Sequence, residues 1–223
     1  MDGTMEFFGR VRAALKSTDV VVDLGAGRGA WYYEDKSEAR RQLRHIKPIV
    51  AKLIGLDIDP IVLTNPTTTE NYVIESDRLP LADCCADAVI ADYVLEHIQN
   101  VEMFFQEIDR ILKPGGYFCA RTPHKYQYVS TFARIVKNKY HTDVLSRAQP
   151  NRKPEDVFPT AYCLNTYGDI KRTFKNYANF SYLYCSEPSY YFGQKQIYEC
   201  LSVFQRFLPQ IFVSNLFIFL KKP

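Results

Sequence analysis

The chain has 223 residues, of which 47% are hydrophobic and 24% are charged, and its formal net charge is +3 at pH 7. This profile fits one globular domain with a substantial core. The six cysteines form no C-x-x-C pair and no His–Cys cluster with zinc spacing, so the sequence predicts no metal site and reduced, mostly buried thiols.

Neither end of the sequence carries a pattern that directs a chain into a membrane. The N-terminal residues lack the long apolar core of a signal peptide. The most apolar segment, 211–220, is too short to span a bilayer as a helix, and Ser214 and Asn215 interrupt it. We therefore expect a cytoplasmic protein.

Helices and strands alternate through the first 121 residues. A helical stripe over 6–16 leads into a run of valines that begins at Val20, which is typical of a buried parallel strand. The elements expected next are a charged crossover helix (31–46), strands at 52–57, 72–75 and 86–91, an amphipathic helix (101–112) and a strand (117–121). This order predicts βαβ units and a parallel sheet.

The alternation ends after Pro123. Between residues 121 and 153 the chain carries eight Lys or Arg residues and a single acid, Asp143. We expect a basic, aromatic elaboration at about 125–160, followed by a helix (166–177), a strand (180–184), a helix (197–208) and a closing strand (211–220). The whole chain, 1–223, is thus predicted to form a single domain.

The stretch from Val20 to Ala30, VVVDLGAGRGA, places glycines directly after the first strand. Such glycines let the backbone turn sharply and approach a ligand. If a helix follows, its free N–H groups point at that ligand. The residues from Gly25 to Ala30 also satisfy the G-x-G-x-x-G/A fingerprint of dinucleotide-binding enzymes, so an NAD-dependent oxidoreductase is one interpretation.

Asp23 favours a different cofactor. Its carboxylate precedes the first glycine by two residues and would lie close to the ligand, where it would repel a pyrophosphate. S-adenosylmethionine (SAM) has no phosphate and carries an α-ammonium group and a sulfonium, which a carboxylate attracts. Asp57, which ends the second strand, suits ribose hydroxyls with either cofactor because a carboxylate can accept hydrogen bonds from both.

Five motifs occur in order over residues 20–121. They are Asp-x-Gly-x-Gly at 23–27, an acid at 57, Leu-Pro-Leu at 79–81, Asp-Tyr-Val-Leu-Glu-His at 92–97 and Leu-Lys-Pro-Gly-Gly at 112–116. Together they resemble class I SAM-dependent methyltransferases, most closely the methyltransferase type 11 group, which includes the ubiquinone/menaquinone-type enzymes. The resemblance implies a Rossmann-like three-layer α/β sandwich with a mostly parallel seven-stranded sheet and an antiparallel last strand. It also implies SAM as the cofactor and methyl transfer as the reaction.

The resemblance further implies which residues bind SAM. In that family the glycine loop holds the methionine moiety, and the acid of the second strand binds the ribose, with the next residue against the adenine. An Asp before Leu-Pro contacts the adenine amino group; here Glu75 fills that slot, and either Glu75 or Asp77 would make the contact. Residues after the fourth strand would flank the transferable methyl. The implied residues are Asp23, Gly25, Ala26, Gly27, Asp57, Ile58, Glu75, Ser76 (through its backbone N–H), Asp77, Ala91, Asp92 and Tyr93.

The catalytic candidates are histidines. Methyl transfer from SAM is an in-line displacement, so an enzyme mainly supplies alignment, and a base is needed only when the acceptor must lose a proton. His97 and His124 follow the fourth and fifth strands and are the candidates for a base or an acceptor contact, with His141 a third. The alternatives are local packing for His97 and ordering of a loop for His124. Because no general base stands out, a non-catalytic module that keeps the fold and serves a partner is the alternative function.

The acceptor class follows from weaker signals. The sequence lacks the Asn/Asp-Pro-Pro-aromatic signature of enzymes that methylate exocyclic amino groups of nucleic-acid bases, which argues against a nucleic-acid acceptor. The basic segment has three interpretations: a solvated face, a site for an anionic acceptor such as a phosphorylated glycan, or a peripheral contact with an anionic membrane. We expect a small-molecule, lipid or glycan acceptor.

Overall fold

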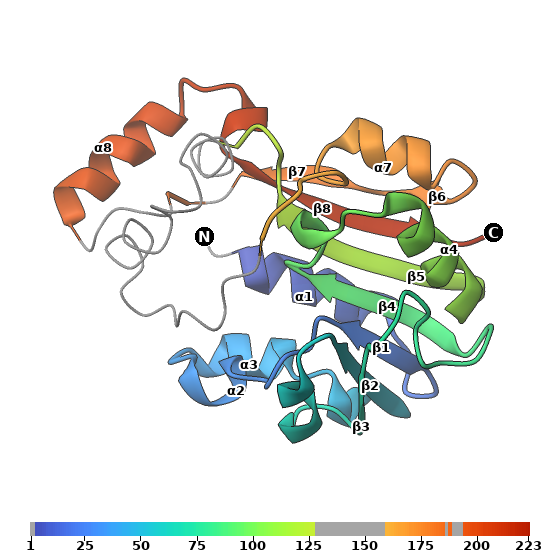
Figure 1. The fold of residues 1–223 in the computed structure, drawn as a ribbon. Helices are drawn as coiled ribbons and strands as arrows, with labels where there is room; N and C mark the ends of the chain where they lie inside the picture. The colour runs from blue at the N-terminus through green and yellow to red at the C-terminus, as the bar shows by residue number, and fades with distance from the viewer. Residues whose placement is uncertain (1–2, 128–158, 186, 189–193) are drawn as a thin grey trace.

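The computed structural model describes residues 3–127, 159–185, 187–188 and 194–223. Most of the predicted basic elaboration, together with His141, lies outside these residues. Figure 1 shows one sheet with helices on both of its faces, while α8 (Lys195–Gln205) extends to one side of it.

The described residues form one eight-stranded sheet in the order β3-β2-β1-β4-β5-β8-β6, and β7 also pairs with β8. Strands β1 to β5 pair in parallel, whereas β8 is antiparallel to β5, β6 and β7. The bounds are β1 (Val20–Leu24), β2 (Lys52–Asp57), β3 (Glu70–Val73), β4 (Ala86–Asp92), β5 (Leu112–Pro123), β6 (Ala178–Asn179), β7 (Tyr182–Cys185) and β8 (Ser214–Lys221). The predicted mostly parallel α/β fold with an antiparallel last strand is confirmed.

The sheet has eight strands where the sequence predicts seven, because a two-residue strand, β6, precedes the strand expected over 180–184, which is found as β7. Asn179 Oδ1 accepts a hydrogen bond from the Ser181 backbone N–H (2.9 Å), which forms a local turn between β6 and β7. The Phe180 N–H donates to the Phe219 carbonyl (2.9 Å), so the chain stays beside β8 between the two strands.

Two hydrophobic clusters cover the two faces of the sheet and make the fold a three-layer sandwich. On one face, α1 (Gly3–Ala14) contributes Phe7, Phe8 and Val11 to a buried cluster with residues of the sheet. On the other face lie α4 (Val101–Ile111) and α7 (Tyr167–Thr173), both on the right in Figure 1. The ring of Phe174, which caps α7, stacks on Phe118 of β5 at 5.4 Å between centroids.

The helix predicted over 31–46 is interrupted. The structure has α2 (Trp31–Glu34) and α3 (Glu38–Arg44) instead, separated by residues 35–37. Asp35 Oδ1 accepts from the Ser37 backbone N–H (2.8 Å), and Ser37 caps α3 by accepting from the Arg40 N–H (3.4 Å). Short polar side chains of this kind compete with helical hydrogen bonds and favour a helix start, which explains the break.

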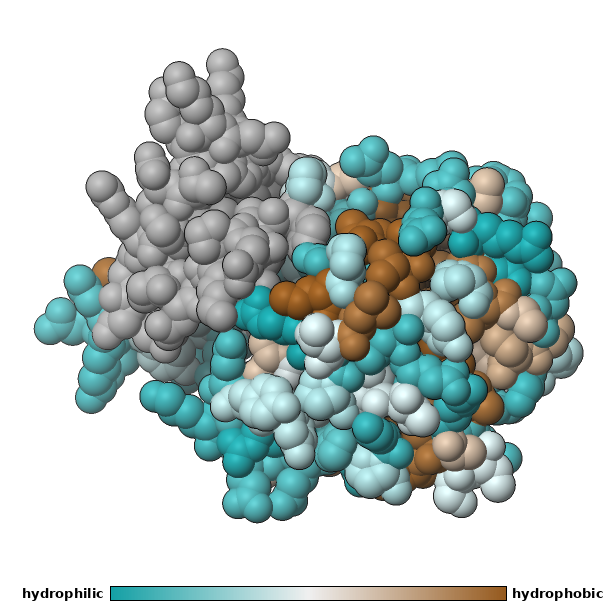
Figure 2. Space-filling view, turned by 60° about the horizontal axis from the view of Figure 1, so that its bottom comes forward, coloured by the Kyte–Doolittle hydropathy of each residue, from teal (hydrophilic) through white to brown (hydrophobic). Residues whose placement is uncertain are grey.

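Shorter elements connect these layers. They are the 3-10 helices η1 (Lys47–Ile49), η2 (Pro60–Thr64), η3 (Leu95–His97) and η5 (Gln210–Phe212). In the part of the chain that the structure describes, no helix has the length and apolarity needed to cross a bilayer. The face of the molecule in Figure 2 is mainly hydrophilic, with smaller hydrophobic areas between the polar side chains.

A buried ion pair joins β4 to β5 at the end of the sheet. Arg121, whose exposed fraction is 4%, donates from Nε to Asp92 Oδ1 (2.5 Å) and from Nη2 to Asp92 Oδ2 (3.0 Å). Its Nη1 donates to Thr4 Oγ1 (3.0 Å), so the same guanidinium also holds the start of α1. One side chain thus fixes the relative position of two strands and a helix.

We predict that Arg121→Ala lowers the free energy of unfolding by about 3–5 kcal/mol, because it leaves the Asp92 carboxylate buried without its bidentate partner. Urea denaturation measures this change. The control is Arg10→Ala, which removes an exposed pair with Glu6 and costs less than about 1 kcal/mol. Equal losses for the two variants would contradict the role given to Arg121.

Candidate cofactor site

Three carboxylates meet at the carboxyl edge of the parallel strands. Asp23 lies next to Leu24, the last residue of β1, while Asp57 and Asp92 end β2 and β4. Strands β2 and β4 flank β1 in the sheet, so their ends lie beside one another. Ligands of open α/β sheets bind outside this edge.

The glycine loop is held by hydrogen bonds to β2. The backbone N–H groups of Gly25 and Ala26 both donate to the Leu56 carbonyl, at 2.7 and 3.1 Å. The Gly27 N–H donates to Asp57 Oδ2 (2.8 Å), which ties the loop to the carboxylate expected to bind ribose. The other oxygen of this carboxylate, Oδ1, accepts from the Asp59 N–H (3.0 Å).

Two glycines of the loop are required for different reasons. Gly25 has φ +75°, and a Cβ at this position would overlap Cγ2 of Val94. Gly27 has φ +51°, but its nearest neighbour to a Cβ is Asp57 Oδ2 at 4.0 Å, so open space lies in front of its backbone. Gly25 therefore permits close packing against the chain after β4, and Gly27 leaves the backbone accessible to a ligand.

Asn65 holds the glycine loop through hydrogen bonds from its side chain. It is not among the residues predicted from the sequence. It follows η2 and is 4% exposed. Its Nδ2 donates to the carbonyls of Ala26 (3.1 Å) and Gly27 (3.0 Å), and its Oδ1 accepts from Thr67. An Asn in a loop 38 residues after the glycines gives no sequence signal for this contact, which only the folded chain creates.

A small pocket opens beside the glycine loop, next to Asp23. Its volume is about 20 Å³, close to the space needed for one water molecule. Carboxylates and a guanidinium face it together with aromatic rings. The lining residues include Phe8, Asp23, Gly25, Ala26, Trp31, Arg44 and Asp92.

The carboxylate of Asp23 has no hydrogen-bond or salt-bridge partner among the described residues. Its pKa is raised to about 7, mainly by burial; the Arg44 guanidinium lowers it, and the nearby carboxylates of Asp92 and Asp57 contribute to the rise. A carboxylate so placed is stabilised in its charged form by any cation that enters the pocket.

The pKa of Asp92 is shifted in the opposite direction from that of Asp23, although both residues line the same pocket. Burial raises the pKa of this carboxyl, but the guanidinium groups of Arg121 and Arg44 outweigh burial and hold it below its ordinary value. Asp92 is therefore ionised and paired. Of the two pocket carboxylates, Asp23 is the one left for a ligand.

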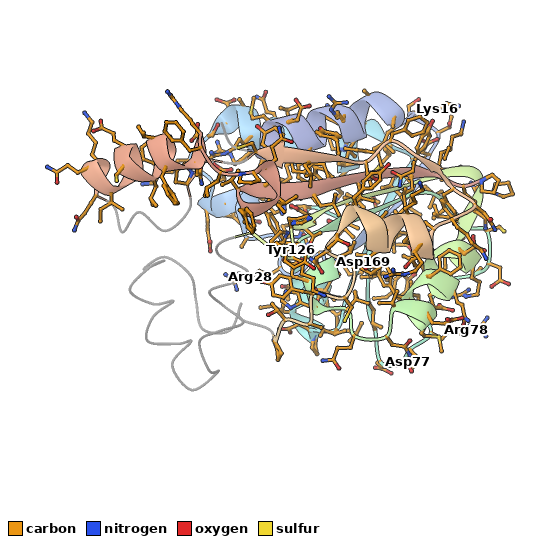
Figure 3. The ribbon with its side chains drawn as sticks, turned by 90° about the horizontal axis from the view of Figure 1, so that it is seen from above. Lys16, Arg28, Asp77, Arg78, Tyr126 and Asp169 are labelled. Carbon is orange, nitrogen blue, oxygen red and sulfur yellow. The ribbon has the colours of Figure 1, made fainter. Side chains whose placement is uncertain are left out.

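The predicted adenine-binding residues divide into two groups. Ile58 is 63% exposed directly after Asp57, as a residue that covers an adenine ring should be. Glu75 and Ser76 line an open depression beside β3. Figure 3 shows Asp77 beside Arg78 at the lower edge of that view, away from Arg28 of the glycine loop.

Tyr93 follows β4 in a strained conformation. Its φ is +60°, which is uncommon for a bulky residue other than glycine. The ring lies over the Arg121 guanidinium (4.8 Å to the centroid), and Asn215 Nδ2 donates to its hydroxyl oxygen (3.1 Å). Ala91, by contrast, is fully buried in β4 and can offer a ligand only its backbone.

Both described candidate histidines contact backbone groups. His97 Nδ1 lies 2.7 Å from the Pro159 carbonyl oxygen. His124 is buried, its Nδ1 accepts from the Tyr126 N–H (3.3 Å), and its ring also bonds the backbone of Ile211. Burial holds the pKa of His124 below its ordinary value, so this ring is neutral at pH 7. These contacts position the segments around the site.

Comparisons with known proteins agree with this geometry. Residues 22–120 match a family model described as a methyltransferase domain. A protein of Mycolicibacterium smegmatis named "Probable S-adenosylmethionine-dependent methyltransferase" is 30% identical over 108 residues, which cover 47% of this chain and 42% of that protein. The mitochondrial ubiquinone biosynthesis O-methyltransferase of Rattus norvegicus is 49% identical over 66 residues, covering 26% of this chain and 19% of the relative.

A solved structure extends the comparison to the whole fold. The SAM-dependent methyltransferase of Archaeoglobus fulgidus superposes with a TM-score of 0.58 at 14% identity, covering 98% of this chain and 92% of that one. The chain spans less than half the length of the two curated relatives above. Residues 22–120 thus match a methyltransferase domain, and the chain shares the fold of a solved SAM-dependent methyltransferase, as the five motifs predict.

The residues present fit SAM, the cofactor of this class. The unpaired Asp23 carboxylate suits an α-ammonium group, and the open backbone at Gly27 suits a ligand that passes close to the loop. Among the described residues, no group of three or more His, Cys, Asp or Glu side chains could hold a metal ion.

We predict that Gly25→Ala destabilises the protein by more than Gly115→Ala. Both positions have positive φ (+75° and +77°), so each alanine incurs backbone strain of about 1 kcal/mol. Only the Cβ at position 25 also meets Val94, whereas nothing lies within 4 Å of one at position 115. Urea midpoints of the two variants measure the difference, and equal midpoints would contradict the close packing of the loop on Val94.

Proposed function

We propose that this protein is an enzyme that transfers a methyl group from SAM to a small-molecule, lipid or glycan acceptor. The observation that carries the proposal is the unpaired Asp23 carboxylate beside the glycine loop, at the edge where Asp57 and the end of β4 also lie. A dinucleotide would bring a pyrophosphate to this loop, next to the Asp23 carboxylate, which no cation among the described residues contacts through a hydrogen bond or salt bridge. The arrangement therefore supports SAM over NAD.

Different residues bind the methionine moiety, the ribose and the adenine of SAM in this proposal. Asp23, Gly25, Ala26 and Gly27 hold the methionine moiety, with Asp92 behind them. Asp57 binds the ribose hydroxyls with the lone pairs left by its two backbone contacts. Ile58 covers the adenine, and Glu75 with the Ser76 N–H contacts its edge.

SAM supplies the electrophilic methyl group, so the protein's contribution is alignment and exclusion of water. Tyr93 is the residue best placed to flank the methyl, because its strained backbone sets the ring at the end of β4. Asn215 and the Arg121 guanidinium hold that ring in place.

We propose positioning roles for His97 and His124. His97 Nδ1 contacts the Pro159 carbonyl, and the His124 ring bonds the backbone of Tyr126 and Ile211, so each ring joins segments that are distant or adjacent in the chain. An acceptor that is already a nucleophile at neutral pH needs no base from the protein. The names of relatives point to quinone-type acceptors for those proteins, and a small apolar ring is one acceptor consistent with the proposed class.

Calorimetric titration tests the cofactor directly. We expect the protein to bind S-adenosylhomocysteine (SAH), the product form of SAM, and to show no comparable binding of NAD. Asp57→Ala should weaken SAH binding by about tenfold or more, because it removes the charged acceptor to which the ribose hydroxyls donate. Binding of NAD without SAH, or unchanged SAH affinity in the variant, would refute the assignment.

The affinity for SAH should rise with pH. Only ionised Asp23 attracts the ammonium group, and with a pKa of about 7 its ionised fraction increases about tenfold between pH 6 and pH 8. The dissociation constant should therefore fall by up to about tenfold over this range. Asp23→Asn should bind more weakly at pH 8 and lose the dependence; a wild-type affinity that is flat with pH would count against this role of Asp23.

A further inference from the structure

We infer that Arg44 is the residue that recognises the α-carboxylate of the cofactor, and that it makes the pocket selective for ligands with a complete amino-acid end. This inference rests on the proposed function. Arg44 is the last residue of α3, outside all five sequence motifs, and it lines the same pocket as Asp23. The amino-acid end of SAM carries an α-ammonium group and an α-carboxylate. An anionic and a cationic side chain that lie side by side can bind both groups.

Arg44 can leave its present partner, Asp92, because Arg121 remains paired with that carboxylate. Among the described residues its one carboxylate contact is Asp92, at 3.2 Å from Nη2 to Oδ2. Arg121 already holds both oxygens of Asp92. A guanidinium has five N–H donors, so Arg44 keeps donors for a further anion.

The surroundings of Arg44 hold its charge over the pocket. The guanidinium carbon lies 5.1 Å from the ring centroid of Trp31 and 5.4 Å from that of Phe8. Such faces attract a cation without using up its N–H groups. The side chain remains partly exposed at 29%, in contrast to the buried Arg121.

The opposite charges of the pocket match those of the ligand. Asp23 lacks a hydrogen-bonded partner and is influenced electrostatically by Arg44. The pocket volume of about 20 Å³ is smaller than an amino-acid group, and movement of a lining side chain would enlarge it. Release of Arg44 from Asp92 toward the ligand carboxylate both opens the pocket and forms a planar, bidentate-capable pair.

The test compares two ligands that differ only at the amino-acid end. SAH carries it, whereas 5′-methylthioadenosine keeps the adenine, ribose and sulfur but lacks the amino and carboxyl groups. Calorimetry should show that Arg44→Gln weakens SAH by about tenfold or more and changes 5′-methylthioadenosine by less than about twofold. Arg44→Lys, which keeps the charge without the planar fork, should bind SAH with intermediate affinity.

Arg41→Gln is the matched control, because Arg41 lies on the same helix but donates to the Asp35 carbonyl and does not line the pocket. It should leave the affinities for both ligands unchanged. SAH affinity retained in Arg44→Gln, or equal losses for the two ligands, would overturn the inference while leaving the SAM assignment intact. Failure of the wild-type protein to bind SAH would overturn both.

Discussion

The ion pair between Asp92 and Arg121 lies where the two central strands β4 and β5 reach the site. It holds α1 through Thr4 and supports the ring of Tyr93, so the wall of the pocket, the start of the chain and the residue after β4 are fixed by one guanidinium. Arg121 donates to both oxygens of Asp92. Among the described residues, the second arginine, Arg44, and the second acid, Asp23, form no hydrogen bond or salt bridge with each other. In the proposed binding mode, Asp23 and Arg44 are the acid and the cation that bind the two charged groups of the cofactor's amino-acid end.

Much of the fold follows from the sequence. The valines of β1, the KLIGLD run of β2 and the spacing of apolar residues in α4 are strong local signals, and the structure confirms them at nearly the predicted bounds. Two errors occur where short polar side chains decide the outcome: Asp35 and Ser37 divide a helix that the composition of 31–46 favours, and the turn at Asn179 follows an extra strand, β6. The expectation of mostly buried thiols is also wrong, because four of the six cysteines, Cys84, Cys163, Cys185 and Cys200, are exposed.

The site is predictable only in part, for a physical reason. Asp23, the glycines and Asp57 belong to contiguous motifs whose spacing reflects local backbone geometry. Asn65 and Arg44 contribute through tertiary contacts with residues far along the chain, and no periodicity marks them. The engagement of His97 with Pro159 likewise depends on how a distant segment folds back, so the sequence alone could not separate positioning from catalysis.

The central claim is that this arrangement of charges serves methyl transfer. Its most direct test is incubation of the protein with methyl-tritiated SAM and a fractionated cell extract, followed by identification of the labelled product. The account predicts that label enters a small-molecule, lipid or glycan fraction and that Asp57→Ala abolishes the transfer. Binding of SAH without transfer of label to any fraction would contradict it and would favour a non-catalytic module.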